Sequence, residues 1–486
     1  MSNETGSIPD GEAFDPGPEN LEWVPALIIV WAKEEWLRCG EVALFNRPGQ
    51  TFSLGRGDDS PDGHRRVKWI QQRPGENTPT PPLATSVTSR DQLLVTARAQ
   101  GLEFQNVGKY PMIVDGRIVE RFTGEPGDLV LLHGQFLLLV TRRELRMKPR
   151  HHFAEAFVRP FGMPNALNLI GEAPETWRML DELAFAARMG GHVLLRGETG
   201  TGKEPAGRAI HLMSPEAAGP YVSISAGNIP PTLVEDALFG HVKNVTHGGM
   251  AATMGVIGQA DGGILFLDEI ARLSEDLQVA LLRVMDDGDY RQVGGQKNLV
   301  SRFRLIAALN REHERLTRDL RGRMAHIVWM PTLSTRHEDI PLLLRPLLAR
   351  AAARAPDLVE PLRTRQTDGT IEIVPPVELL DRLMRVEDFE GNIRDLDAAL
   401  NEQLRQSPDL RDPAAAIRGS TPAPPDAQGS DGREEKRAAT LTVEEIEWCL
   451  GQTGGNHKAA AERLTVSRGA LYRAMDRLGM KRKKEE

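Results

Sequence analysis

Short apolar runs separated by turn residues characterise the chain from Ala26 to about Arg143. The clearest runs are Ala26–Val30, Gln92–Val95, Met112–Val114 and Leu129–Leu132. Runs of this length between turn residues are typical of strands in an all-β sandwich. We therefore expect a β-sandwich over residues 21–148, with a Pro-rich loop from Arg73 to Pro82 inside it.

The pattern changes from Leu169 onward. Strand-like runs alternate with helical stretches such as Leu277–Met285, and the runs are Val193–Leu195, Ile264–Leu267 and Leu305–Ala308. This alternation predicts a parallel sheet covered by helices over residues 165–335. A more helical part is expected over residues 336–405.

The remaining segments differ in composition from both regions. Residues 1–20 hold five acids and no Lys or Arg, which predicts a disordered leader. Residues 406–440 are rich in Pro, Gly and polar residues and predict a flexible linker. Residues 441–486 have a helical pattern with a basic end. The fold class that follows is multidomain: an N-terminal β-sandwich, a central α/β domain with a helical lid, and a C-terminal all-α segment.

Composition narrows the classes of protein. The net charge of -8 excludes a uniformly basic nucleic-acid coat, but residues 448–484 carry nine Lys or Arg against two acids. Two cysteines, Cys39 and Cys449, cannot build a disulfide framework, and their scarcity fits a reducing compartment. Neither a membrane-length apolar run nor the residue order of a signal peptide is present. A cytoplasmic protein without membrane contact is expected.

The strongest chemical signal is a glycine-rich segment directly after the run Val193–Leu195. Its residues are Gly197, Glu198, Thr199, Gly200, Thr201, Gly202, Lys203 and Glu204. Such glycines let main-chain N–H groups curl around a polyphosphate, and the following helix N-terminus adds positive potential. Lys203 would then reach the β- and γ-phosphates. We predict a polyphosphate-binding site.

A second apolar strand, Gly263–Leu267, ends in two carboxylates. Asp268 is predicted to hold Mg2+ against the phosphates, and Glu269 to position the attacking water. Such a strand end alone is often just solvated. About sixty residues after a phosphate loop, it favours a nucleotide triphosphatase.

Residues 168–404 resemble the AAA+ domain of bacterial sigma-54-dependent transcription activators. The motifs that carry this resemblance are Gly197-Glu-Thr-Gly-Thr-Gly-Lys-Glu204, Ala209-Ile-His211, Ala237-Leu-Phe-Gly-His241, Gly262-Gly-Ile-Leu-Phe-Leu-Asp-Glu-Ile270, Arg291-Gln-Val-Gly-Gly295, Glu338-Asp-Ile-Pro-Leu-Leu343 and Gly391-Asn-Ile-Arg-Asp-Leu396. The resemblance implies a ring of six or seven copies, an ATPase that remodels RNA polymerase holoenzyme at a promoter.

Three further roles follow from the resemblance. Asn310 matches the sensor that couples the γ-phosphate to the sheet. Arg394 matches the second sensor, an arginine that the lid places on the nucleotide. Arg323 matches an arginine offered to the ATP of the neighbouring subunit, where a guanidinium stabilises charge on the transferring phosphoryl group.

The sequence departs from this family at three places. The family loop Gly-Ala-Phe-Thr-Gly-Ala, which contacts the sigma factor, is replaced here, with Thr246 for the Phe and His247 for the Thr. Ser225 stands where the family has an Asn that restrains the catalytic Glu, and Thr317 replaces one finger arginine. A serine cannot reproduce the hydrogen bonds of an amide. Nucleotide binding is therefore predicted more firmly than fast hydrolysis, and the changed loop argues against contact with sigma-54.

The N-terminal region resembles a forkhead-associated domain, a β-sandwich that binds phosphothreonine peptides. Phe52-Ser-Leu-Gly-Arg56, Thr88-Ser-Arg90, Phe104-Gln-Asn106, Val114-Asp-Gly116 and Pro126-Gly-Asp128 carry this resemblance. It implies that Arg56 and Ser89 contact phosphate, and a guanidinium suits a dianion because it offers paired donors. Lys109 and Asn106 match the positions for phosphate and peptide backbone, and Gln92 replaces a structural His. The alternative is a sandwich that only packs against the ATPase.

The C-terminal segment predicts three helices, Val443–Gln452, His457–Leu464 and Arg468–Leu478, the last two joined by a short turn. This is helix-turn-helix geometry. Gly454-Gly-Asn456, Ala459-Ala460 and Val466-Ser-Arg-Gly-Ala-Leu-Tyr-Arg473 resemble the Fis-type domain of many such activators. Arg468, Tyr472 and Arg473 would face DNA, and Arg477 would neutralise phosphate.

Two main functions remain open. The first is a transcription regulator that binds DNA, ATP, a phosphothreonine protein and polymerase. The second is a DNA-binding regulator that works without sigma-54 and uses its AAA+ module as a nucleotide-dependent assembly switch. A plain phosphopeptide adaptor is less favoured, because it leaves the ATPase and DNA-binding signals unexplained.

Overall fold

The computed structural model describes residues 23–85, 88–99, 101–132, 134–243, 251–310 and 316–406. All of these belong to the first of two units of the chain, Met1–Pro408. The predicted leader and linker and the predicted helix-turn-helix with Arg468, Tyr472, Arg473 and Arg477 lie outside the described residues. The same holds for Thr246 and His247.

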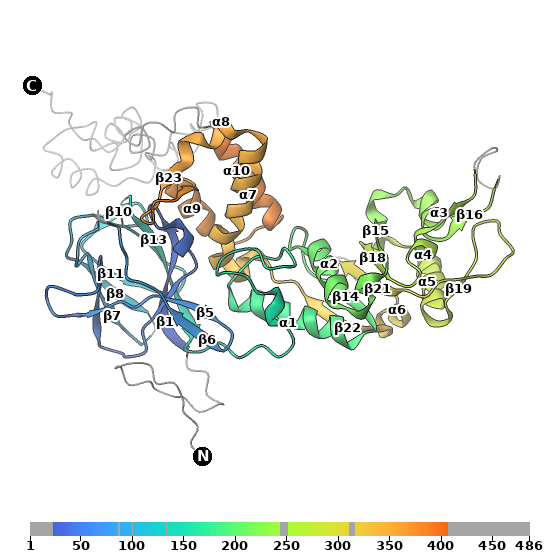
Figure 1. The fold of residues 1–486 in the computed structure, drawn as a ribbon, viewed down its shortest axis with the longest axis horizontal. Helices are drawn as coiled ribbons and strands as arrows, with labels where there is room; N and C mark the ends of the chain where they lie inside the picture. The colour runs from blue at the N-terminus through green and yellow to red at the C-terminus, as the bar shows by residue number, and fades with distance from the viewer. Residues whose placement is uncertain are drawn as a thin grey trace, which may run out of the picture. The chain divides into compact units, whose positions relative to one another are not determined.

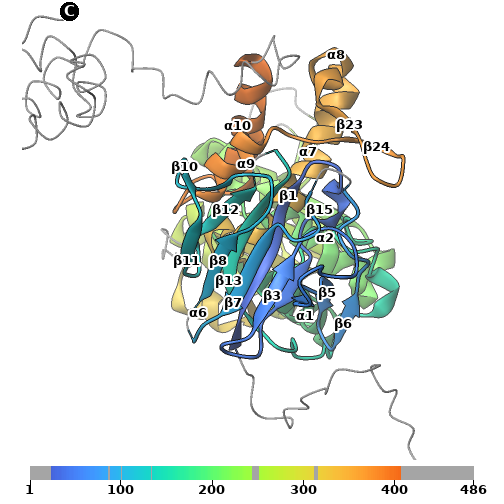
Figure 2. The ribbon, with the colours of Figure 1, turned by 90° about the vertical axis from the view of Figure 1, so that its left-hand side faces the viewer.

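The N-terminal part, Trp23–Glu144, consists of strands in two sheets and is called the β region here (Figures 1 and 2). One sheet has the order β10-β9-β12-β13-β1-β2-β5-β6, with bounds Arg117–Val119, Met112–Val114, Leu129–Leu132, Phe136–Glu144, Trp23–Ala32, Val42–Leu44, Ile70–Arg73 and Glu76–Pro79. The other has the order β11-β8-β7-β3-β4, with bounds Arg121–Gly124, Leu102–Asn106, Leu93–Ala97, Thr51–Leu54 and Arg65–Arg66. The sheets meet at Gly124, where an added Cβ would lie 3.0 Å from Val140 of the opposite sheet.

Strand β1 is buried at every position after Trp23. Its sequence is apolar throughout rather than alternating, as expected for a strand covered on both faces. The lid helices α7 (Ile340–Arg354) and α9 (Val377–Met384) contact β1. The Nε1 of Trp31 also donates a buried 2.8 Å hydrogen bond to the carbonyl of Pro375.

The prediction of one long loop from Arg73 to Pro82 is wrong. Residues Glu76–Pro79 form β6, which pairs antiparallel with β5. Gly75 makes the tight turn with a φ of 80°. A proline at the end of β6 is tolerated because this strand lies at the sheet edge, where its missing N–H removes no ladder bond.

The central part is a parallel sheet with the strand order β15-β18-β21-β14-β22, as the alternation predicted (Figure 1). These strands span Tyr221–Ser225, Ile264–Asp268, Arg304–Leu309, His192–Arg196 and Met324–Trp329. The helices of this α/β core are α1 Pro174–Met189, α2 Lys203–Met213, α3 Val234–Phe239, α4 Val256–Gln259, α5 Glu275–Asp287 and α6 Arg318–Gly322.

Consecutive residues of β14 point to opposite faces of this sheet. Val193 and Leu195 join the cluster that holds α1 and α2, whereas Leu194 joins the cluster that holds α5. Both faces are therefore apolar, which is why the strands read as unbroken hydrophobic runs.

The lid region, Ile340–Gln406, contains more than helices. It comprises α7, α8 (Pro356–Val359), α9 and α10 (Ile393–Gln406), but also a hairpin of β23 (Arg363–Arg365) and β24 (Ile371–Ile373). This hairpin is not predicted from the sequence, because each strand is only three residues long. Its tip contacts the β region: the Oε1 of Gln366 accepts the N–H of Trp36 at 2.7 Å, and the N–H of Thr367 donates to Glu34.

Candidate nucleotide and phosphopeptide sites

The predicted phosphate loop lies between β14 and α2, in the strand-loop-helix order that the sequence indicated. Gly200 and Gly202 have φ values of 77° and 99°, which favour glycine. Lys203 is the first residue of α2. The main-chain N–H groups of Lys203 and Glu204, at the start of this helix, have no partner within it and can serve an anion.

The side chain of Lys203 turns back onto the loop. Its Nζ donates to the carbonyls of Gly197 and Glu198, at 2.7 and 2.8 Å. Burial lowers the pKa of Lys203, and the charge of Arg394 acts in the same direction against the opposing charge of Asp268. A bound anion would relieve the repulsion between the two cations.

The next three carbonyls of the loop are held from farther along the chain. The Nδ2 of Asn392 donates to Thr199 at 3.1 Å, the N–H of Ile393 donates to Gly200, and Arg336 donates to Thr201. The carbonyls of five consecutive loop residues, 197–201, therefore all accept hydrogen bonds. Neither Asn392 nor Arg336 is predicted from the sequence to belong to the site. Asn392 lies within the motif that holds Arg394, whereas Arg336 lies two positions before the motif that begins at Glu338.

The two carboxylates lie at the end of β18. Asp268 pairs with Ser225 across the sheet, and its Oδ1 accepts the N–H of Glu269. Glu269 has a φ of 54°, and its carboxylate lies against Gly227, where an added Cβ would be 1.6 Å from Oε2. Arg272 approaches Glu269 at 3.7 Å. Ser225 thus lies beside this carboxylate pair, as the sequence predicted.

Both predicted sensors lie at the phosphate loop. The Nδ2 of Asn310, just after β21, donates to the Oγ1 of Thr199 at 3.1 Å. Arg394 lies in the first turn of α10, and its Cγ is 3.5 Å from the position of a Cβ added to Gly200. The structure therefore brings Lys203, Asp268, Asn310 and Arg394 around one loop.

Arg323 lies elsewhere. It follows α6 and forms a 2.9 Å ion pair with Asp286 at the end of α5. Burial lowers the pKa of His192, the first residue of β14, and the nearby charge of Arg323 lowers it further. The phosphate loop follows the other end of that strand. Arg323 is therefore remote from the phosphate loop of its own chain.

These residues suit a nucleoside triphosphate with a divalent cation. Lys203, Arg394 and the free N–H groups at the start of α2 match phosphate charge. Asp268 supplies a carboxylate of the kind Mg2+ takes together with phosphate oxygens. Within the described ranges no group of three or more His, Cys, Asp or Glu side chains could hold a metal ion by itself.

The four predicted phosphopeptide residues lie together at one end of the β region. The N–H of Arg56 donates to the carbonyl of Ser89, and the Oγ of Ser89 accepts the N–H of Lys109, both at 3.0 Å. Asn106, at the end of β8, donates through Nδ2 to the carbonyl of Tyr110. Residues 56–61 and Arg90 surround a pocket of about 310 Å³ beside Arg56.

Gln92 holds these loops in place of the missing histidine. Its buried side chain donates to Asn106 Oδ1 and to the carbonyl of Tyr110, both at 2.8 Å. Its own carbonyl accepts the N–H groups of Val107 and Gly108. A residue that the sequence analysis treated as a departure is therefore the main support of this loop.

Arg66 and Asp91 form a second support that the sequence did not indicate. Arg66 donates to Asp91 at 3.1 Å and to the carbonyls of Arg90 and Asp59. Burial tends to raise the pKa of Asp91, but hydrogen bonds from Ser53 and Ser60 and the charge of Arg66 outweigh burial and lower it. The loops that carry Arg56 and Ser89 are thus braced by a buried ion pair.

Comparison with known proteins matches the same parts of the chain. Residues 169–326 match the sigma-54 interaction domain, and residues 443–478 match the Fis family of bacterial regulatory proteins. The transcriptional regulatory protein ZraR of Salmonella typhimurium is 32% identical over 64% of this chain and 68% of its own length. The chain belongs to the sigma-54 interaction domain family.

Other similar proteins match this chain over different shares of their own length. The Nif-specific regulatory protein of Azotobacter vinelandii is 34% identical over 51% of this chain, but the matched part spans only 46% of that protein. A crystal structure of NtrX from Brucella abortus with ADP is 26% identical, covers 65% of this chain and 70% of its own, and has a TM-score of 0.45. Across the described parts of the chain, every helix is too short or too polar to cross a bilayer.

Proposed function

We propose that this protein is a bacterial transcription regulator that binds ATP with Mg2+ at the phosphate loop. The observation that carries the proposal is the meeting of four elements at that loop: Lys203 from α2, Asp268 from β18, Asn310 after β21 and Arg394 from α10. Each has the charge or donor that a phosphate–magnesium group requires.

Direct binding tests this proposal. Wild-type protein is expected to bind a fluorescent ATP analogue in the presence of Mg2+, whereas Lys203→Ala loses at least about a hundredfold in affinity, because a buried charge-assisted contact is removed. Lys297→Ala, which removes an exposed lysine of the same core, is the matched control. Equal affinity in Lys203→Ala and wild type would refute the proposed site.

Hydrolysis in a ring of six or seven copies is part of the proposal, with Glu269 positioning water and Arg323 acting on the ATP of a neighbouring subunit. The remote place of Arg323 supports a role between subunits. Mixing subunits tests it: Lys203→Ala and Arg323→Ala are each expected to be inactive, but their mixture regains turnover. A mixture without regained turnover would contradict a shared site.

The family suggests action on sigma-54 polymerase, whereas the loop with Thr246 and His247 favours the second candidate, an assembly switch that works without sigma-54. Transcription from a sigma-54 promoter with ATP separates them. Activity of the native protein would reject the switch. Activity only after Thr246→Phe with His247→Thr would support it.

The C-terminal segment is proposed to bind DNA, and the match of residues 443–478 supports this. Full-length protein is expected to shift DNA in a gel with strong salt dependence, because Lys and Arg displace counterions from phosphate. Arg473→Ala should weaken binding, with Lys148→Ala, a lysine before α1, as control. Binding insensitive to salt and to Arg473→Ala would contradict the assignment.

The β region is proposed to bind a phosphothreonine protein through Arg56, Ser89, Asn106 and Lys109. The support is their place on adjoining loops braced by Gln92 and Arg66. A phosphothreonine peptide library should bind wild type and not Arg56→Ala. Arg98→Ala is the control, because Arg98 pairs with Glu103 beyond the far end of β7. Equal binding by wild type and Arg56→Ala would remove the assignment.

A further inference from the structure

Two arginines of the β region form ion pairs with acids near the nucleotide site. Arg73, at the end of β5, holds the carboxylate of Glu172 through two nitrogens, at 3.0 and 2.5 Å. Arg143, in β13, pairs with Glu338 at 3.0 Å. Glu172, Arg143 and Glu338 are largely buried, with side-chain exposures of 6%, 4% and 12%. Buried pairs of this kind fix geometry, because losing one partner leaves an uncompensated charge.

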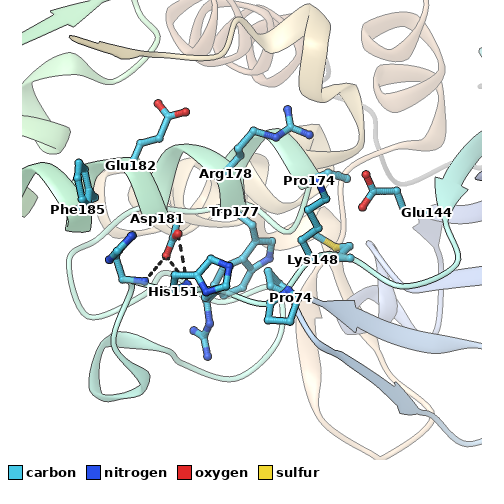
Figure 3. A pocket seen from close by; sticks show the side chains of 14 residues that line it. Pro74, Glu144, Lys148, His151, Pro174, Trp177, Arg178, Asp181, Glu182 and Phe185 are labelled. Atoms are coloured by element: carbon cyan, nitrogen blue, oxygen red, sulfur yellow. Dashed lines mark hydrogen bonds between the residues drawn. The ribbon is translucent and has the colours of Figure 1, made fainter. Parts of the chain in front are cut away.

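The segment that joins the β region to α1 is also fixed. Figure 3 shows Asp181 of α1 beside the connecting segment, in the wall of a pocket of about 520 Å³. Oδ1 of Asp181 accepts the N–H groups of His151, His152 and Phe153. Trp177 in the same wall donates to Glu172 at 3.0 Å, so Glu172 has both charged and neutral partners. The position of Glu172 therefore depends on the contact between the β region and α1.

Asp339 links the two acidic partners. It follows Glu338 directly and accepts the N–H of Glu172 at 2.7 Å and that of Ala173 at 3.0 Å. Asp339 is fully buried, and an added Cβ at Gly171 would lie 2.3 Å from its Oδ2. A shift of Glu172 or Glu338 must therefore move Asp339, because the site leaves no space for independent adjustment.

Arg336 completes the connection to the phosphate loop. Burial lowers the pKa of this guanidinium, and the charge of Asp339 opposes the shift. Its Nη2 donates to the carbonyl of Thr201 in the phosphate loop, at 3.3 Å. The route thus runs by hydrogen bonds from Arg73 to Glu172 and from Glu172 to Asp339, then along the segment Leu333–Asp339 to Arg336, and from Arg336 to the loop.

We propose that Arg73 and Arg143 are positioning residues for nucleotide binding: the docked β region holds Glu172 and Glu338, and through Arg336 keeps the phosphate loop in its binding shape. Release of the β region would then lower nucleotide affinity. This proposal rests on the proposed ATP site. It gives a physical route by which an event on the β region acts on nucleotide, through a contiguous network of the kind that carries coupling between sites.

Nucleotide affinity of full-length variants tests the proposal. Arg73→Ala and Arg143→Ala are each expected to weaken binding of a fluorescent ADP by about 2- to 30-fold, the range typical of coupling between distant sites. Arg73→Lys, which keeps the charge but not the paired contact, should fall between Arg73→Ala and wild type. Arg142→Ala is the matched control, since Arg142 neighbours Arg143 and donates to the carbonyl of Trp23 instead. Variants that bind like Arg142→Ala would overturn the proposal.

A double-mutant cycle separates this route from general loosening. In an Arg336→Gln background, Arg73→Ala should have no further effect on affinity, whereas fully additive effects would overturn the route. Thermal melting shows whether each variant is folded, and Arg336→Lys replaces the glutamine variant if that one unfolds. Wild type without nucleotide binding would overturn both this proposal and the ATP site. Normal wild-type binding with unaffected arginine variants would overturn this proposal alone.

Discussion

The two sites proposed to take phosphate are braced in different ways. Asn392, which holds the phosphate loop, lies 193 positions from its partner Thr199, and Arg336 lies 135 positions from Thr201. In the β region, Gln92 is only 14 positions from Asn106. The phosphate loop thus takes its shape from distant parts of the chain, whereas the phosphopeptide loops take theirs from their own sheet. We infer that the first site responds to domain docking and the second does not.

Among the variants that test this difference between the two sites, the largest effect on stability and nucleotide affinity is expected at Gly200. An added Cβ would lie 1.9 Å from the carbonyl of Gly391, and the φ of 77° is unfavourable for other residues. Gly200→Ala should force the lid from the loop, cost at least about 2 kcal/mol of stability and reduce nucleotide affinity at least tenfold, measured by melting and titration.

Gly369→Ala is the control for Gly200→Ala. Gly369 also has a positive φ, 87°, but open space around it. Gly369→Ala should cost about 1–2 kcal/mol of stability and leave nucleotide affinity unchanged. Equal affinity losses in both variants would mean that backbone strain, and not the contact with the lid, matters.

Asn392 should give the next largest effect. It is fully buried with a φ of 51°, and its side chain accepts the N–H of Leu333 at 2.7 Å and donates to Glu198 and Thr199. Asn392→Gly keeps the backbone but leaves buried groups unpaired, at about 1–3 kcal/mol. Asn392→Asp adds repulsion toward Glu198 and should weaken nucleotide binding more than the glycine variant does. A titration in which Asn392→Gly binds nucleotide more weakly than Asn392→Asp would contradict this expectation.

These residues also show what the sequence could and could not reveal. The order of strand, glycine loop and helix was readable, because apolar runs and glycines are local signals. The motif that holds Arg394 was recognised, yet its neighbour Asn392 was not assigned, since its partners lie far away in the chain. The β23–β24 hairpin escaped because its three-residue strands show no period. Gln92 was recognised as a replacement, but its function depends on the loop geometry around Tyr110.

Gln92 tests the independence of the second site. Gln92→Leu has a side chain of similar size but removes the hydrogen bonds to Asn106 and Tyr110. The loss should lower the free energy of unfolding by about 1–3 kcal/mol and remove most of the phosphopeptide affinity. Gln92→His should retain part of the binding, because a ring nitrogen can still donate. Nucleotide affinity should stay at the wild-type value in both variants. A lower nucleotide affinity in Gln92→Leu would show that the two sites are not braced separately.

The smallest effect concerns pH at the contact between β13 and the segment before α7. Burial raises the pKa of Glu338 to about 7, although Arg143 acts against the shift. Between about pH 4.5 and 7 the folded chain keeps this proton while the unfolded chain has lost it. Folding then takes up a proton, so this group lowers stability as pH rises through that range, and its effect is constant above it.

Glu338→Gln cannot titrate and should lack this loss. The melting temperature of Glu338→Gln minus that of wild type should therefore rise from pH 5 to 7.5. The rise per ~1 kcal/mol should be smaller than the ~2–4 °C that applies to units of 150–250 residues, because this unit spans Met1–Pro408. If the melting temperature of Glu338→Gln minus that of wild type fell as pH rises, the ionised pair of Glu338 with Arg143 would prevail over the effect of burial. Loss of the proton from Glu338 would then strengthen the docking of the β region rather than weaken it.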